Sequence, residues 1–318
     1  MVALFGLLLI VAGCFIGEPI LEHVLGRQPD TPYLGAVNTF THKPDGPWAW
    51  VPARTSLDVA HLRNGNTLFV LGADGPLGRD ELLRVLAGGR VSLEIAIFAT
   101  LIAMVLGVSA GTVAGWYGGA TDAILGRLTE LFMAFPLLLL VIAFGQTVAA
   151  RFDDVTIHGA FAPGVLSLSV VIGAFSWFYP ARICRALVQD LREREFVEAA
   201  RMIGQRDRRI LWRHILPHLV GPMSVWATLV GAGVIVLEAA LSALNFGVKL
   251  PTPSWGNLLG SNFGTLLNFD PFNDSTTGTY VTTNWTLFWP SAALFLTVLC
   301  LSLAGDGLRN ALDPKGDG

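Results

Sequence analysis

Residues 195–218 read EFVEAARMIGQRDRRILWRHILPH and lie between two apolar stretches that are each long enough to cross a membrane. The chain of 318 residues is 53% hydrophobic and only 14% charged, whereas soluble domains carry about a quarter charged residues. The sequence therefore predicts an integral membrane protein that concentrates its arginines in one link between membrane spans.

Six apolar stretches are candidates for membrane spans, each of which needs about 20 mostly apolar residues. They are residues 2–16, 92–114, 125–149, 164–186, 219–244 and 285–303. The first is short and begins beside Met1. We expect an all-α, polytopic membrane helix bundle with six transmembrane helices and prolines at positions 136, 180, 222 and 290 inside them, where neighbouring helices tolerate the kinks.

The distribution of Lys and Arg in the short connections predicts the orientation. The links after the third and fifth spans contain only Arg151 and Lys249, whereas the link after the fourth span holds Arg182, Arg185, Arg192, Arg194, Arg201, Arg206, Arg208, Arg209 and Arg213. We therefore expect this link and both termini to be cytoplasmic. The predicted organisation is a first transmembrane helix over 1–17, an extracytoplasmic segment over 18–90, a core with five transmembrane helices over 91–305 and a cytoplasmic tail over 306–318.

An alternative exists for the first span, because VAGC at residues 11–14 ends an apolar run with small residues and a cysteine, as a lipoprotein signal does. No Lys or Arg precedes the run, however, and a signal peptide has a positive first region. A start codon further upstream, with a few basic residues absent from this sequence, is the other explanation.

The remaining composition excludes several classes of function. The net charge of −3 gives no basic surface for nucleic acid. Cys14, Cys184 and Cys300 show no metal-ligand spacing, and the six histidines form no HExxH pair. The chain also lacks a GxSxG elbow and a phosphate-binding GxxxxGK[ST] loop. We expect no catalytic residues, no metal or cofactor site, and no ATP bound by this chain itself.

The arginine-rich link predicts two short amphipathic helices. Apolar residues recur at helical spacing in the first half, at Phe196, Ala199, Ala200 and Ile203. Gly204 interrupts this pattern. Asp207 is then the expected N-cap of a second helix, which carries Ile210, Leu211, Trp212 and Ile215 and which Pro217 ends. Pattern alone leaves four interpretations open: helices held on anionic lipid, a topogenic charge cluster, a solvated loop, or a protein-docking element.

A family resemblance favours the docking element. Glu198, Ala199 and Ala200, followed by Gly204 and by HILP at 214–217, resemble the EAA motif of permease subunits of bacterial ABC importers. Four further stretches are similar, in the same order, to the C-type permeases of dipeptide and oligopeptide importers. They are GRDELLRVLAGGRVSL (78–93), RLTELFMAFPLLLL (127–140), PTPSWGNLL (251–259) and GDGLRNALDPK (305–315).

The resemblance implies a permease of the bacterial inner membrane that moves peptides by alternating access. Its implied partners are a second homologous permease, two cytoplasmic ATPases that bind ATP and Mg²⁺, an extracytoplasmic substrate-binding protein, the peptide and membrane lipid. The EAA segment is then a coupling helix that docks into an ATPase, with small residues for close approach and a glycine for a sharp exit. The implied docking residues are Glu198, Ala199, Ala200, Arg201, Gly204, Ile215, Leu216 and Pro217.

Three acids fall inside or near the ends of the spans, where an unpaired charge is costly. Glu94, Glu130 and Glu238 are candidates either for contact with a peptide in the pathway or for structural pairing, with Arg127 one turn from Glu130. Two other functions remain open. One is import of nickel or another small solute by the same kind of permease, and the other is a membrane scaffold or enzyme without transport.

Overall fold

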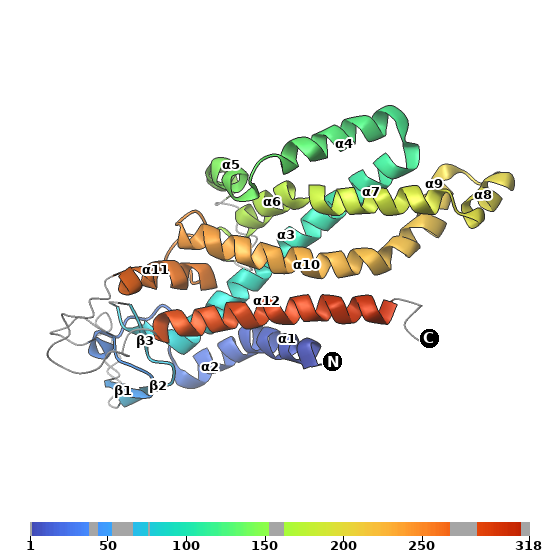
Figure 1. Cartoon of the computed structure of the whole chain (residues 1–318). Coiled ribbons are helices and arrows are strands. Elements are labelled where there is room, and N and C mark those ends of the chain that lie inside the picture. Colours follow the sequence, from blue (N-terminus) through green and yellow to red (C-terminus); the bar gives the residue numbers. More distant parts are fainter. Residues whose placement is uncertain are drawn as a thin grey trace.

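The computed structural model describes residues 2–37, 44–52, 66–75, 77–152, 162–267 and 285–312. The expected tail is thus described only up to Leu312. Most of the molecule is an elongated bundle of helices (Figure 1), with short strands and α11 at one end and α8 and α9 at the other. The start of α1 and the end of α12 lie toward the end that carries α8 and α9.

The six predicted spans correspond to helices whose bounds differ from the expected ones. The first is a continuous helix, Val2–Leu25, built from α1 (Val2–Ala12), the π-helical turn Gly13–Gly17 and α2 (Glu18–Leu25). At 24 residues it extends well past position 16 and is long enough to cross a membrane. The second, α3 (Glu81–Tyr117), begins before the expected position 92, and the last, α12 (Trp285–Leu312), ends after 303.

Two of the predicted spans are bent helix pairs rather than straight helices. The third comprises α4 (Gly119–Met133) and α5 (Leu137–Phe152), with a bend of 88° at Pro136. The fourth comprises α6 (Val165–Ser176) and α7 (Phe178–Arg192), with a bend of 43°. Within the described residues, length and composition give four membrane-length helices, or up to six when each bent pair counts as one span. The prediction of an all-α membrane bundle is therefore confirmed.

The fifth span is the clearest departure from the sequence prediction. The segments α9 (Asp207–Ile210), η3 (Leu211–Ile215, π-helical) and α10 (Leu216–Ala243) form one helix of 37 residues. Pro217 lies in the first turn of α10 and does not end a helix, so the expected break was wrong. The wider π-helical turn directly before the proline accommodates the missing N–H and the bulk of the ring.

The helix α3 is central, with contacts to α6, α7, α10, α11 and α12. A seam of three glycines, Gly107, Gly111 and Gly115, permits the close packing against α7: a Cβ atom added at Gly111 would lie 2.5 Å from the Ala181 carbonyl oxygen. Small residues at such seams are how membrane helices approach closely, since lipid gives little hydrophobic drive for their association. The seam fixes α7, and with it the start of the arginine-rich link.

The segment between α2 and α3, which the sequence predicts to be extracytoplasmic, folds onto the N-terminal end of α3. It contains a 3₁₀ turn (Leu34–Ala36) and two antiparallel pairs, β1 (Ala49–Pro52) with β2 (Asn66–Phe69) and β3 (Ala73–Asp74) with β4 (Arg79–Asp80). Asp80 caps α3 by accepting from the backbone N–H groups of Leu82 and Leu83, and it pairs with buried Arg27 at 2.5 Å. Burial raises the pKa of the Asp80 carboxyl, while Arg27 and the two N–H groups oppose that shift.

The helix α11 (Trp255–Leu267), which the sequence analysis did not predict, closes this end of the bundle. The indole N–H of Trp255 donates to the Val85 carbonyl at 2.9 Å, and the Asn262 amide donates to Asp74 at 2.9 Å. Asp74 also pairs with buried Arg84 at 2.9 Å. The stretches 78–93 and 251–259 thus meet near the N-terminal end of α3, where Trp255 bonds to Val85, and Asn262 and Asp74 extend this contact to Arg84.

The glycine seam makes a stability prediction. Gly111→Ala places a methyl group against the α7 backbone, so we expect the isolated chain in detergent to lose about 1–3 kcal/mol of stability and to melt several degrees lower. Gly233→Ala is the matched control, because a Cβ there meets nothing within 4 Å. Thermal unfolding of the two variants tests this, and equal melting temperatures would contradict the seam.

Candidate functional site: the arginine-rich hairpin

The link between α7 and α10 forms a helical hairpin, defined here as residues 195–215, which projects beyond the bundle (Figure 1). Its first arm is α8 (Glu195–Met202). The arm ends in a Schellman motif, in which Gly204 N–H donates to the Arg201 carbonyl at 2.9 Å and Gln205 N–H to the Ala200 carbonyl at 3.1 Å. Gly204 has a φ of +73°, a left-handed conformation that strongly favours glycine. The predicted glycine turn is therefore confirmed.

The faces of α8 are arranged differently from the prediction. Val197 and Ala200 are the buried residues, whereas Phe196, Ala199 and Ile203 are exposed. The expected apolar face was therefore wrong except at Ala200. The reason is that α8 packs through one narrow stripe against α7 and against the last turn of α3 at Trp116, called here the foot of α3. The stripe lies in a cluster with Trp116, Cys184 and Val188. Periodicity alone cannot tell which side of a short helix meets its own protein.

The second arm begins with an extended Arg206 as N-cap, and Asp207 is the first helical residue. The expected Asp207 cap was therefore wrong, and no side-chain cap bond forms there. Ile210 and Ile215 are buried in the same cluster as Val197. The ring of Phe196 stacks on that of His218 with centroids 5.2 Å apart, which joins the first arm to the start of α10.

The outward surface of the hairpin combines acids with large apolar side chains. Glu195, Glu198 and Ala199 are exposed on α8, and Met202 (81%) and Ile203 (75%) are exposed at its end, as is Trp212 (68%) on the second arm. We call these six residues the outer face of the hairpin. Exposed apolar side chains that are grouped in this way mark sites of protein contact.

The candidate docking residues divide into two groups. Glu198 and Ala199 belong to the outer face, and Gly204 and Pro217 are also exposed. Ala200 and Ile215 are buried against the chain's own helices, and Leu216 is half-buried. The guanidinium of Arg201 lies 4.9 Å from the ring centroid of Trp116. The structure thus brings all eight into one region, and five of them, Arg201 included, are exposed.

Four arginines of the link contact the chain itself: Arg194 pairs with Asp190 of α7 at 2.8 Å, and three others reach the end of α3 or the start of α4. Arg185 pairs with Asp122 in the first turn of α4, with Nη2 to Oδ2 at 2.7 Å, and Arg192 donates to the Trp116 carbonyl at 3.0 Å. Arg201 is the third, through its contact with the Trp116 ring. Their common target, the end of α3 and the start of α4, was missed by the sequence analysis. The signal was the tryptophan at the end of an apolar run, directly before the YGG turn.

The three intramembrane acids have different surroundings. Glu94 pairs with Arg90 one turn earlier at 3.0 Å. Glu238 is fully buried and accepts hydrogen bonds from Ser92 at 2.9 Å and Ser242 at 2.7 Å. Ser92 in turn accepts from the Trp255 backbone N–H at 3.2 Å, so this carboxyl connects α3, α10 and α11. Glu130 is exposed on α4.

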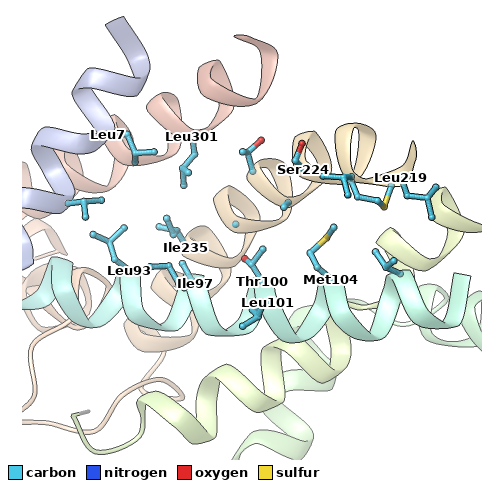
Figure 2. Close-up of a pocket in the computed structure, with 18 of the residues that line it drawn as sticks. Leu7, Leu93, Ile97, Thr100, Leu101, Met104, Leu219, Ser224, Ile235 and Leu301 are labelled. Carbon is cyan, nitrogen blue, oxygen red and sulfur yellow. The ribbon is translucent and has the colours of Figure 1, made fainter. Parts of the chain in front are cut away.

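A long apolar groove of about 710 Å³ runs between α1, α3, α10 and α12 (Figure 2). Its lining includes Leu93 and Ile235 toward one end, Thr100 in the middle and Met104 and Leu219 toward the other. None of the three acids is among its lining residues. Within the described ranges, no group of three or more His, Cys, Asp or Glu side chains is arranged to hold a metal ion.

These features define a polytopic membrane protein with a helical hairpin at one end of its bundle. The fold is similar to that of a chain in the solved structure titled "Inward facing conformations of the MetNI methionine ABC transporter", with a TM-score of 0.52, 16% identity, and coverage of 72% of this chain and 96% of that one. At this identity the likeness concerns the fold alone. Residues 95–317 match the family described as "Binding-protein-dependent transport system inner membrane component", and the chain belongs to that family.

Relatives in this family agree with the resemblance inferred from the motifs. The chain is 34% identical to the oligopeptide transport system permease protein OppC of Haemophilus influenzae over 280 residues, 87% of this chain and 77% of that protein. It is 36% identical to the dipeptide transport system permease protein DppC of Alkalihalophilus pseudofirmus over 272 residues, 84% and 80% of the two chains. The predicted family and the multi-pass inner-membrane location are confirmed.

The bonds of Glu238 predict a structural role. Glu238→Ala leaves two buried serine hydroxyls without their acceptor, so we expect a loss of about 1–3 kcal/mol of stability. Glu238→Gln keeps an acceptor oxygen and should stay close to the parent in both melting temperature and transport, as should the exposed control Glu130→Gln. A Glu238→Gln protein that assembles and melts normally but transports nothing would instead place this carboxyl in the pathway.

Proposed function

We propose that this chain is a permease subunit of an ATP-driven importer that moves dipeptides or oligopeptides across the inner membrane by alternating access. The permease proteins OppC and DppC, to which it is similar over most of its length, carry oligopeptide and dipeptide transport in their names. In this proposal the chain pairs with a second homologous permease, receives peptide from an extracytoplasmic binding protein, and catalyses no covalent chemistry itself.

The observation that carries the coupling part of the proposal is the outer face of the hairpin. Glu198 and Ala199 present a carboxylate and a small side chain beside exposed Met202 and Ile203. An ATPase cleft with apolar walls and basic residues at its rim is complementary to this surface. ATP and Mg²⁺ then bind to the two ATPases, and this chain holds neither.

Orientation follows from the same segment. The concentration of arginines in residues 182–213 favours the cytoplasmic side for the hairpin. Because the start of α1 and the end of α12 lie toward the hairpin end of the bundle, both termini are cytoplasmic as well in this proposal. The strands, α11 and the N-terminal end of α3 then lie on the extracytoplasmic side and face the binding protein.

The continuous helix of the second arm supplies the mechanical link. Since α9, η3 and α10 form one helix, a displacement of the hairpin is passed directly to the fifth span. The buried Ile210 and Ile215 hold this arm against α7 and the foot of α3. Closure of the ATPases therefore moves at least three spans together, which is the motion that alternating access requires.

Gly204 provides a sharp test of docking. Gly204→Val forces a β-branched residue into a left-handed turn and should detach most of the ATPase during purification of the complex, whereas Gly204→Asn tolerates that conformation and should retain most of it. Glu198→Arg should also lose the ATPase, while the exposed control Arg208→Gln should not. Copurification of unchanged amounts of ATPase with Gly204→Val and Glu198→Arg would refute docking through this face.

The transported solute is tested with the complete importer in proteoliposomes. ATP-dependent uptake of labelled dipeptide or oligopeptide, dependent on the binding protein, is the expected result. Uptake of Ni²⁺ in place of peptide would support the metal importer instead. Absence of any ATPase or binding protein from the purified complex would support a scaffold without transport.

A further inference from the structure

Trp116 occupies the point where the hairpin meets the bundle. It lies in the last turn of α3 and is only 3% exposed, although the helix ends one residue later. Its side chain shares an apolar cluster with Val197 and Ala200 of the first arm and with Ile210 and Ile215 of the second. One side chain of the second span therefore belongs to the same buried cluster as residues of both arms.

Two cations of the link converge on this residue. Arg192, the last residue of α7, donates to the Trp116 carbonyl at 3.0 Å. That carbonyl is one of the last four in α3, which have no partner within the helix. Arg201, on α8, places its guanidinium over the indole ring at 4.9 Å. Both positive charges stand at the negative end of the helix dipole of α3, which favours them there.

The position of Arg201 separates it from the outer face. Ala200 is buried, and the exposed Arg201 places its guanidinium over the ring of Trp116. Glu198, Ala199 and Met202 are also exposed and belong to the outer face. A cation that stacks on a buried indole is already engaged within its own chain. Its chemistry is therefore better suited to fastening α8 than to recognising a partner.

We infer that Arg201 and Trp116 form a clamp that fastens the first arm of the hairpin to the foot of α3, so that Arg201 is a positioning residue and does not dock the ATPase. The glycine seam already joins α3 to α7, and the clamp adds α8 to the same rigid unit. This inference rests on the proposed function, because its consequence is that motion of the docked hairpin reaches the second span as well as the fifth.

The test uses the complete importer in proteoliposomes, with its ATPases and binding protein. The single variants are Arg201→Met, Arg201→Lys, Trp116→Leu and Trp116→Phe. The double variant combines Arg201→Met with Trp116→Leu. Arg208→Met is the matched control for loss of an exposed arginine in the same hairpin. The measurements are the ATPase retained after purification, and hydrolysis and peptide uptake with and without loaded binding protein.

The clamp predicts a loss of coupling without a loss of docking. Arg201→Met and Trp116→Leu should retain the ATPase fully, while the stimulation of hydrolysis by loaded binding protein should fall about two- to fivefold, the range of a cation–π contact at a solvated site. Arg201→Lys and Trp116→Phe keep a cation and a ring and should recover much of it. The double variant should be no worse than either single one, because both remove the same contact.

Two results would overturn the clamp. Loss of the ATPase from Arg201→Met, matching the loss expected from Glu198→Arg, would show that Arg201 docks the partner. Full stimulation in Arg201→Met would show that the contact transmits nothing, even if Trp116→Leu is too unstable to assay. Failure of the proposed function itself looks different, since the parent importer would then copurify with no ATPase, and the clamp would fall with it.

Discussion

The close contact between α3 and α7 is the constraint on which the rest of the bundle depends. Gly107, Gly111 and Gly115 let the α7 backbone approach so closely that a methyl group at position 111 would meet a carbonyl oxygen. In lipid, where burial of apolar surface between helices gives little free energy, this close fit is a principal source of association. It also brings Arg185 and Arg192 of α7 to the end of α3 and the start of α4, which is where the hairpin packs.

The two ends of α3 are fixed by different physics. At the N-terminal end of α3, buried ion pairs and hydrogen bonds join Asp80 to Arg27, Asp74 to Arg84 and Glu238 to two serines. Such networks have well-defined geometry, because any broken bond leaves a buried polar group unsatisfied. At the hairpin end, apolar packing around Trp116 is combined with a glycine turn and an exposed surface.

The arginines of the link serve more purposes than orientation. Arg185 binds Asp122, Arg192 binds the last turn of α3, and the exposed Arg201 stacks on Trp116. Arg206, Arg208 and Arg209 are exposed at the turn and in the second arm. A count of positive charges favours one side of the membrane, but it does not show which of the arginines contact the chain itself. In the proposed importer this division separates residues that hold the hairpin from residues that present it.

Local features of the sequence were enough to predict the membrane class, the approximate spans, the glycine turn and the family. The length of apolar stretches, the tolerance of glycine for a left-handed conformation and the order of motifs can all be read along the chain. Prediction from sequence failed where contacts with other helices decide the structure. The buried face of α8 depends on its packing against the foot of α3. The presence of Pro136 does not by itself give the 88° bend after α4, and the continuous helix through Pro217 depends on a π-helical turn. Only the tertiary structure paired Glu238 with Ser92, 146 positions away, and Arg201 with Trp116. Contacts between residues so distant in sequence leave no periodic signal, because they arise from how whole helices pack.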